Sequence, residues 1–197
     1  MAALRFLGIA AAVLAATLAG VAAASALTGT ASQSEPPPAA EQFVPRDGTT
    51  RVTPGAADPD GGPRWGVRTY TSREGQSCVE VGRVTPGGRY GRLEANGEVA
   101  ELPSAPSGVC GDLDVDPVIL AINTRAARGG LPARTVLYGQ AAPDVEAMTA
   151  GAPGRAAAPV ALTGERTFVV VAEGIHEASE FPVDVRTRDG EVTRYRW

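Results

Sequence analysis

Three aspartates at alternate positions, Asp112, Asp114 and Asp116, are the strongest candidate for metal chemistry in this chain. Calcium-binding loops use carboxylates at this spacing, because oxygen ligands at alternate loop positions converge on one cation. The motif then departs from the calcium pattern, since Pro117 replaces the glycine of the sharp turn and Asn123 replaces the bidentate glutamate. A looser calcium site in a calcium-stabilised structural module is therefore one interpretation, and a solvated loop without a cofactor is the other.

His176 is the second candidate for chemistry and the only histidine in the chain, with Glu177 and Ser179 close behind it. An imidazole near a hydroxyl and a carboxylate suggests a hydrolase. The nucleophile of such a triad needs a defined turn, however, and the sequence contains no G-x-S-x-G motif. We therefore predict that the protein is not an enzyme. The alternative is a secreted hydrolase that uses His176 or the three aspartates.

The C-terminal hairpin decides where a group of arginines lies. A three-residue loop over residues 188–190, with its glycine in the left-handed conformation, pairs Val183 with Tyr195 and Val185 with Thr193. We choose this register because it collects the apolar side chains on one face, whereas a two-residue loop sets valines opposite arginines.

In that register Arg186, Arg194 and Arg196 share the exposed face of the hairpin, and Asp184 lies opposite Arg194. An arginine stripe of this kind can contact an anionic envelope polymer or phospholipid headgroups. The alternative is a charged face that keeps the sheet soluble.

The N-terminus carries an export signal. Residues 6–24 run without a charge after Arg5, and Ala24-Ser25-Ala26 supplies the small residues of a cleavage site. The run approaches the ~20 residues that span a bilayer, so residues 1–27 are interpreted either as a cleaved signal peptide or as a transmembrane anchor. Both interpretations make the rest of the chain extracytoplasmic, membrane-anchored or secreted, because the flanking positive charge precedes the run.

Cys78 and Cys110 are the only cysteines and both lie in the exported part. An even cysteine count in an oxidising compartment predicts one disulfide between them. The two cysteines do not form a C-x-x-C motif, which is the spacing typical of a redox pair.

Residues 28–63 are rich in proline and glycine and contain almost no large apolar side chain. Such a segment buries too little surface to offset the entropy lost on ordering. We therefore predict a disordered tether over 28–63 between the membrane or cleavage site and the folded part.

A period of two in apolar residues begins near residue 64 and predicts strands. The dipeptide Asn96-Gly97 predicts a hairpin with a two-residue type I′ loop, which sets Leu93 opposite Ala100. The uninterrupted apolar run 118–122 predicts a strand that is buried on both faces.

The predicted fold class is all-β after one N-terminal helix. Residues 64–116 form a small β-meander stapled by the disulfide, and residues 117–197 form an immunoglobulin-like sandwich, with a single larger barrel as the alternative. The sandwich rests on seven short apolar segments, centred near Leu120, Val136, Val145, Val160, Val170, Val183 and Tyr195.

A resemblance covers about two thirds of the chain. Its residues are Trp65–Tyr70, Gly75, Cys78, Val81–Arg83, Val109–Leu113, Val136–Gly139 and Ala142–Val145. The pattern resembles uncharacterised exported β-rich proteins of high-GC bacteria, and the C-terminal part is similar to immunoglobulin-like sandwiches. The resemblance implies a β-rich exported protein and assigns no catalytic residue.

The formal net charge of -4 argues against a general nucleic-acid binder, which needs a basic excess for its phosphate contacts. Together these observations predict a non-catalytic binding or structural domain of the bacterial cell envelope. Its expected partners are an envelope polymer or another protein, and the membrane itself if the N-terminal helix is retained.

Overall fold

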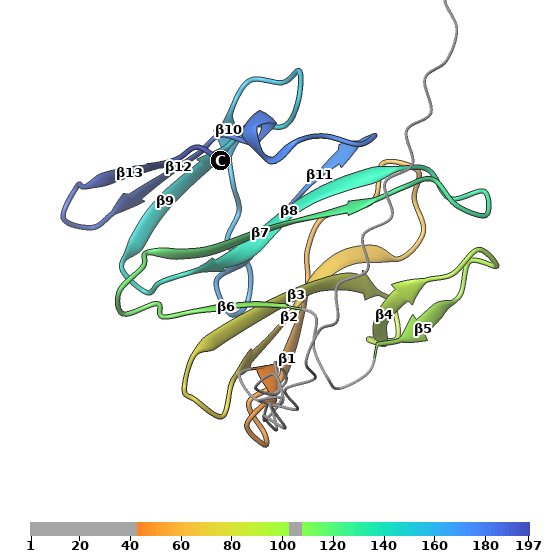
Figure 1. The fold of residues 1–197 in the computed structure, drawn as a ribbon, viewed down its shortest axis with the longest axis horizontal. Coiled ribbons are helices and arrows are strands. Elements are labelled where there is room, and N and C mark those ends of the chain that lie inside the picture. The colour runs from red at the N-terminus through yellow and green to blue at the C-terminus, as the bar shows by residue number, and fades with distance from the viewer. Residues whose placement is uncertain (1–42, 103–107) are drawn as a thin grey trace, which may run out of the picture. The chain divides into compact units, whose positions relative to one another are not determined.

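The computed structural model describes residues 43–102 and 108–197, which belong to one compact unit, Pro36–Trp197 (Figure 1). These ranges contain strands and no α-helix, so the all-β fold class is confirmed for them. No helix within them is long and apolar enough to cross a membrane. The expected signal peptide or anchor at residues 1–27 lies outside the described residues.

The strands form three antiparallel sheets. The six-stranded sheet consists of β1 (Arg51–Pro54), β2 (Arg64–Thr71), β3 (Ser77–Val84), β4 (Tyr90–Leu93), β5 (Val99–Glu101) and β6 (Val109–Gly111). The three-stranded sheet consists of β7 (Val118–Arg125), β8 (Arg134–Ala141) and β11 (Thr167–Glu173). The four-stranded sheet consists of β9 (Val145–Ala150), β10 (Ala158–Pro159), β12 (Val183–Thr187) and β13 (Val192–Tyr195).

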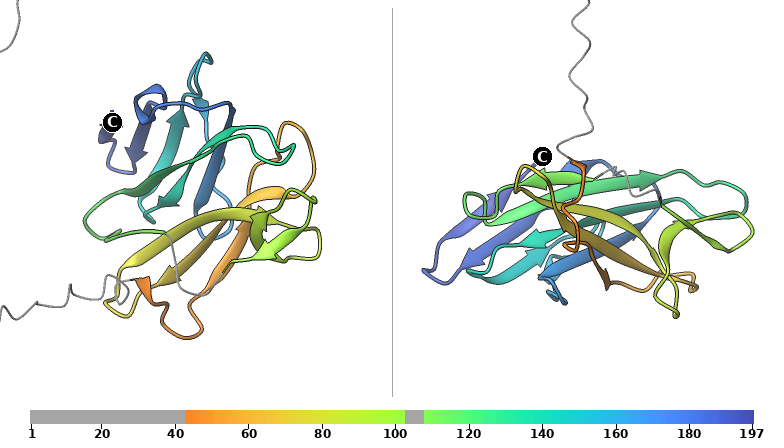
Figure 2. Two further views of the ribbon diagram at one scale, coloured as in Figure 1. Left: turned by 45° about the vertical axis from the view of Figure 1, so that its right-hand side comes forward. Right: turned by 90° about the horizontal axis from the view of Figure 1, so that it is seen from below.

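The three-stranded sheet is the middle layer, with the six-stranded sheet on one face and the four-stranded sheet on the other (Figures 1 and 2). Side chains along a strand alternate between the two faces. In β8, Val136 and Tyr138 therefore pack with Trp65 of the six-stranded sheet, whereas Leu137 packs with Val183 of the four-stranded sheet. The meander and the sandwich thus share one middle sheet.

Strand β7 shows the same division and explains its uninterrupted apolar sequence. Val118, Leu120 and Ile122 join the core beside the four-stranded sheet, and Ile119 and Ala121 join the core beside the six-stranded sheet. The prediction of a strand covered on both faces is confirmed.

Strands β7 to β13 account for all seven segments predicted after residue 117. They divide between two facing sheets with the orders β11-β8-β7 and β10-β9-β12-β13, which gives the two-sheet arrangement of the predicted sandwich. The sheets remain separate, so the alternative of one larger barrel is not adopted.

The C-terminal hairpin has the predicted register. Val183 pairs with Tyr195 and Val185 pairs with Thr193. Gly190 closes the three-residue loop with a φ of 87°. Val183 and Val185 are buried, because this register directs both side chains into the core between the sheets.

The hairpin at Asn96-Gly97 differs from its prediction by one residue. Leu93 pairs with Val99 rather than with Ala100, so the loop has three residues. Only Gly97 adopts a positive φ, 82°, while the Asn96 side-chain oxygen accepts a hydrogen bond from a backbone amide two residues on. The prediction was wrong because the observed register buries Val99, which a two-residue loop would not pair with Leu93.

The predicted disulfide between Cys78 and Cys110 is confirmed. The two residues face each other across the antiparallel pair β3–β6. β6 is three residues long, and among the described strands it pairs with β3 alone, so the disulfide holds it against the sheet. A disulfide is consistent with an oxidising, extracytoplasmic environment.

The prediction of a tether over 28–63 is wrong for residues 43–63, which is more than half of it. Residues 51–54 form β1 and pair with β2, and the isolated bridge Pro45↔Ser72 attaches the chain still earlier. Asp58 is 6% exposed, although this stretch lacks large apolar residues. Backbone pairing and one buried carboxylate order this segment. The prediction was based on amino-acid composition, which indicates neither of these interactions. Residues 28–42 lie outside the described residues.

Candidate functional site

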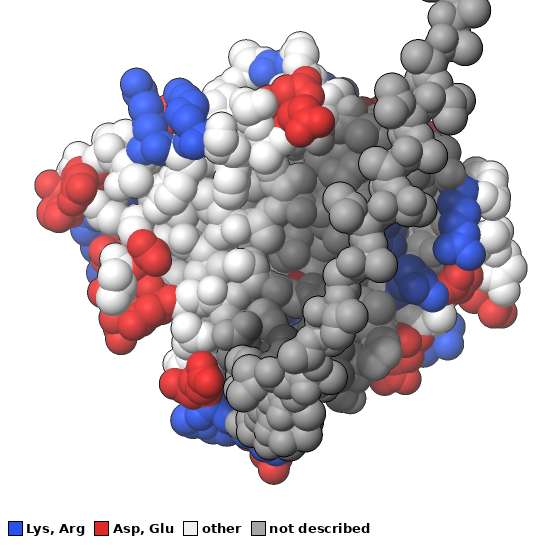
Figure 3. All heavy atoms as spheres, in the orientation of Figure 1, with Lys and Arg blue, Asp and Glu red and all other residues white. Residues whose placement is uncertain are grey.

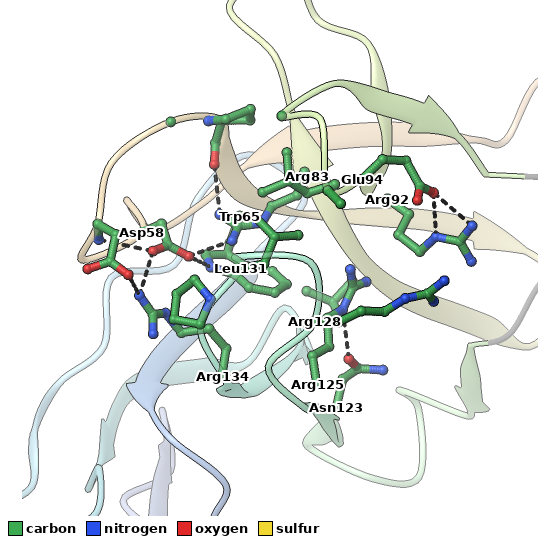
Figure 4. A pocket seen from close by; sticks show the side chains of 18 of the residues that line it. Asp58, Trp65, Arg83, Arg92, Glu94, Asn123, Arg125, Arg128, Leu131 and Arg134 are labelled. Atoms are coloured by element: carbon green, nitrogen blue, oxygen red, sulfur yellow. Dashed lines mark hydrogen bonds and ion pairs between the residues drawn. The ribbon is translucent and has the colours of Figure 1, made fainter.

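A cleft of about 800 Å³ opens between the six-stranded sheet and the end of the β7–β8 hairpin (Figure 4). Its walls come from the loop before β2, from β2 and β3, and from the hairpins β4–β5 and β7–β8. The polar lining includes Asp58, Asp60, Trp65, Glu80, Arg83, Arg92, Glu94, Asn123, Arg125, Arg128 and Arg134, and the apolar lining includes Leu93, Leu102, Leu131 and Pro132.

Asp58 forms a buried charge cluster at one end of this cleft. Its Oδ2 accepts hydrogen bonds from Trp65 Nε1 at 2.9 Å and from Arg83 at 2.5 Å, and its Oδ1 accepts one from Arg134 at 3.0 Å. Arg134 also pairs with Asp60 at the surface. The cluster joins the loop before β2, strand β3 and strand β8, so one carboxylate connects two sheets.

The pKa of Asp58 reflects two opposing effects. Burial raises it, but the hydrogen bonds from Arg134, the Asp60 amide and Trp65, together with the charge of Arg83, outweigh burial and lower the pKa to about 2. Asp58 is therefore ionised at neutral pH. A carboxylate so firmly ionised is a poor general acid or base near neutral pH.

This pKa predicts an acid-sensitive contribution to stability. A depressed folded-state pKa stabilises the fold above the unfolded value of 3.8, and the contribution is lost as pH falls through about 2. We expect the difference in free energy of unfolding between wild type and Asp58→Asn to shrink by about 2 kcal/mol from pH 4 to pH 2. Denaturant unfolding at several pH values measures it. A difference that does not change with pH in this range would contradict the assigned pKa.

Trp65 lies at the base of the cleft beneath two guanidinium groups. The Arg83 guanidinium carbon lies 3.8 Å from the centroid of the ring, and that of Arg125 lies 5.3 Å from it. Both distances permit cation–π attraction. Trp65 and Arg83 are paired directly across β2 and β3, so their side chains share a face.

Arg125 differs from the other arginines of the base in its partners. Its Nε donates to Asn123 Oδ1 at 3.3 Å, and no carboxylate in the described ranges pairs with it. Burial lowers its pKa, and the nearby charges of Arg83 and Arg92 lower it further. Arg92 itself pairs with Glu94.

The tips of two hairpins meet at the edge of the cleft. A Cβ atom placed on Gly129, in the β7–β8 loop, would lie 2.4 Å from the Cβ of Ala95, in the β4–β5 loop. Figure 2 shows these two loops beside each other in both views. The hairpins therefore bound the cleft together, although they belong to different sheets.

The three predicted metal ligands do not gather. Asp112 begins a turn in which its Oδ1 accepts from the Asp114 amide and its carbonyl accepts from the Asp116 amide. All three carboxylates are exposed, and residues 43–102 and 108–197 contain no cluster of three acidic, His or Cys side chains placed to hold a metal ion. The expected solvated loop matches this geometry better than the calcium site.

His176 lies in the loop after β11, before the 3₁₀ turn η2 (Ala178–Glu180). Its Nε2 donates to the Glu173 carbonyl at 2.6 Å, and its Nδ1 contacts Glu180 at 3.3 Å. Both ring nitrogens are therefore engaged locally. Neither His176 nor the three aspartates line the cleft, so this geometry lends no support to the hydrolase alternative.

The arginine stripe lies on the exposed face of β12 and β13, as its register predicts. Arg194 pairs with Asp184 at 3.2 Å, Arg196 approaches the same carboxylate at 4.0 Å, and Arg186 pairs with Glu146 at 3.3 Å. Figure 3 shows basic and acidic side chains beside one another on the visible face. Local acids thus offset much of the positive charge on which an anionic contact there would depend.

Sequence reasoning missed the cleft, but one signal for it was present. Val79, Val81 and Arg83 follow one another at a period of two, so Arg83 continues the apolar face of its strand. An arginine on a core-facing position needs a buried carboxylate. Asp58 is that carboxylate, and it lies in the segment for which the sequence predicts a tether.

Comparisons of the chain with protein-family models, with curated proteins and with solved structures give no match.

Proposed function

We propose that this protein is a non-catalytic binding domain that acts outside the cytoplasm, in the bacterial cell envelope, with the cleft as its ligand site. The observation that carries the proposal is the cleft itself. Its volume of about 800 Å³ lies within the range typical of ligand sites, and its lining combines apolar side chains with a few directed polar groups.

The absence of catalysis is supported by the state of the acidic groups in the cleft. Asp58 is held as an anion between two arginines, and Glu80 pairs with Arg68. General acid–base catalysis works best with a pKa near the working pH, whereas these carboxylates are committed to cationic partners. Such a lining is suited to recognition rather than to proton transfer.

The extracytoplasmic location is supported by the disulfide and by the export signal of the sequence. The protein is either secreted or anchored through the apolar segment at residues 6–24. Its partner is an envelope polymer or another envelope protein, because these are the macromolecules within reach of that position.

A cleft-filling substitution tests the proposal. Ala126 and Ala127 are adjacent and exposed, but only Ala126 lines the cleft. We expect Ala126→Trp in the full chain to reduce retention on envelope fractions of the producing cells at least tenfold, because the indole occupies ligand space. Ala127→Trp is the matched control and should be retained like wild type.

Two outcomes would overturn the proposed function. Unchanged retention of a folded Ala126→Trp protein would remove the cleft as the binding site. Release of soluble fragments from the envelope by wild type, and not by Ala126→Trp, would make the protein an enzyme. Thermal unfolding of both variants verifies that they are folded.

A further inference from the structure

The charges of the cleft do not balance. Arg83 and Arg134 are neutralised by Asp58 and Asp60, and Arg92 is neutralised by Glu94. Within the described ranges, Arg125 and Arg128 form no ion pair. Glu80 also lines the cleft and pairs with Arg68, which lies outside the lining. The five arginines of the lining still exceed its four carboxylates, so the cleft holds a local excess of positive charge in a protein whose formal net charge is -4.

Arg125 is the better positioned of the two unpaired arginines. It ends β7, is half-buried, and lies over Trp65, whereas Arg128 is exposed at the hairpin tip. Because Asn123 accepts from Nε, the bond that orients the guanidinium leaves both terminal nitrogens without a protein acceptor. Figure 4 shows Arg92, Arg125 and Arg128 on the same side of the cleft.

A half-buried guanidinium without a counter-ion is costly, because it gives up hydration without gaining a hydrogen-bonding anion. Burial lowers the pKa of Arg125, and repulsion from nearby Arg83 and Arg92 lowers it further, against the opposing charge of Glu80. An oxyanion in the cleft would supply the missing acceptor and relieve this repulsion. Arginine binds carboxylate and phosphate through two parallel N–H···O bonds, which its terminal nitrogens are free to form here.

The apolar part of the lining indicates what accompanies the anion. Leu93 and Leu131 are partly buried and line the cleft together with Leu102 and Pro132. These side chains can cover the apolar face of a ring or a short chain, but they offer no side-chain hydrogen bond. The ligand would therefore carry its charge on one group and present carbon to the remaining wall.

We propose that the cleft binds a ligand bearing a carboxylate or phosphate group, with the terminal guanidinium nitrogens of Arg125 as the anchor for that group. This inference rests on the proposed function, because it names the ligand class of the same cleft. Arg92 and Arg128 add a field that attracts the anion.

The test compares three sugars with the same body: glucose, glucuronate and glucose 6-phosphate. The protein is the full chain with Trp197→Phe, which leaves Trp65 as the only tryptophan and its fluorescence as the signal. We expect glucuronate or glucose 6-phosphate to bind and glucose to bind at least tenfold more weakly. The stronger of the two acids identifies a carboxylate or a phosphate ligand.

Arg125→Gln should weaken the acidic sugar at least tenfold, which corresponds to about 1.4 kcal/mol of binding free energy. Arg155→Gln is the matched control: it removes the same charge from an exposed arginine outside the cleft. The denaturation midpoint of Arg125→Gln should not fall below the wild-type value, because the substitution removes a half-buried charge that pairs with no carboxylate in the described ranges.

Three results would overturn the inference: no binding of either acid, equal binding of glucose, or unchanged binding by Arg125→Gln. Failure of the proposed function can be distinguished from failure of this inference. If Ala126→Trp abolishes envelope retention while Arg125→Gln does not, the cleft is the site but the ligand is not anchored by this arginine. If Arg125→Gln abolishes binding of the acid while envelope retention is unaffected by Ala126→Trp, the anion site stands and the envelope function fails.

Discussion

Asp58→Asn lowers the free energy of unfolding by about 3–5 kcal/mol, the cost expected when one partner is removed from a buried ion pair. The substitution changes almost no volume, but it leaves Arg83 and Arg134 buried beside a neutral amide. Both arginines are at least 94% buried, and within the described ranges their Nε atoms lack hydrogen-bond partners. Arg134 keeps its ion pair with Asp60, whereas Arg83 keeps the Pro63 carbonyl and no carboxylate among the described residues.

Asp60→Asn is the matched control for this prediction. It removes a second carboxylate that pairs with Arg134, but the Asp60 side chain is 62% exposed. Solvent screens exposed pairs, so we expect a loss of less than about 1 kcal/mol. Equilibrium unfolding in urea measures both variants.

A second variant separates the charge effect from a loss of packing. Combining Asp58→Asn with Arg83→Met should recover part of the stability, because the double variant no longer buries one of the unpaired cations. A loss for Asp58→Asn no larger than that for Asp60→Asn would show that the cluster does not hold the two sheets together.

Replacing both Cys78 and Cys110 by alanine should lower the free energy of unfolding by about 3–4 kcal/mol. The two cysteines are 32 residues apart, so the disulfide removes considerable loop entropy from the unfolded chain. Because β3 is the one strand in the described ranges that pairs with β6, we also expect increased protease cleavage within β6, Val109–Gly111.

Denaturant unfolding with and without reductant checks the second prediction. Wild type should lose stability when reduced and approach the double alanine variant, which should be insensitive to reductant. If reduction and the double alanine substitution each lowered the free energy of unfolding by less than about 1 kcal/mol, the prediction would be wrong. The backbone hydrogen bonds between β3 and β6 would then be enough to hold β6 in place.

The elements predicted correctly are those whose signals are local. In the C-terminal hairpin, the glycine at position 190 and the alternation of Val183 and Val185 agree on one register. In β7, the uninterrupted apolar run is too short for a typical helix and follows a proline, so it favours a strand covered on both faces. Turn residues and apolar periodicity depend only on residues that are close together in the sequence, so both can be recognised without knowledge of the tertiary structure.

The hairpin at Asn96-Gly97 shows the limit of local signals. A glycine with positive φ suits both the two-residue loop and the three-residue loop, so the dipeptide does not choose between them. The choice was made by the pairing of Leu93 with Val99, which buries the valine. That preference comes from packing beyond the turn itself.

Composition, periodicity and turn residues were enough to predict the all-β class, the number of strands after residue 117, the cysteine pair and the face of the last hairpin. The cleft could not be predicted in this way, because it forms where distant segments meet. Asp58 meets Arg83 across 25 residues and Arg134 across 76, and the two hairpin tips that bound the cleft come from different sheets. Strand periodicity reports which face a side chain occupies, but not which distant side chain faces it, because that depends on how whole sheets pack.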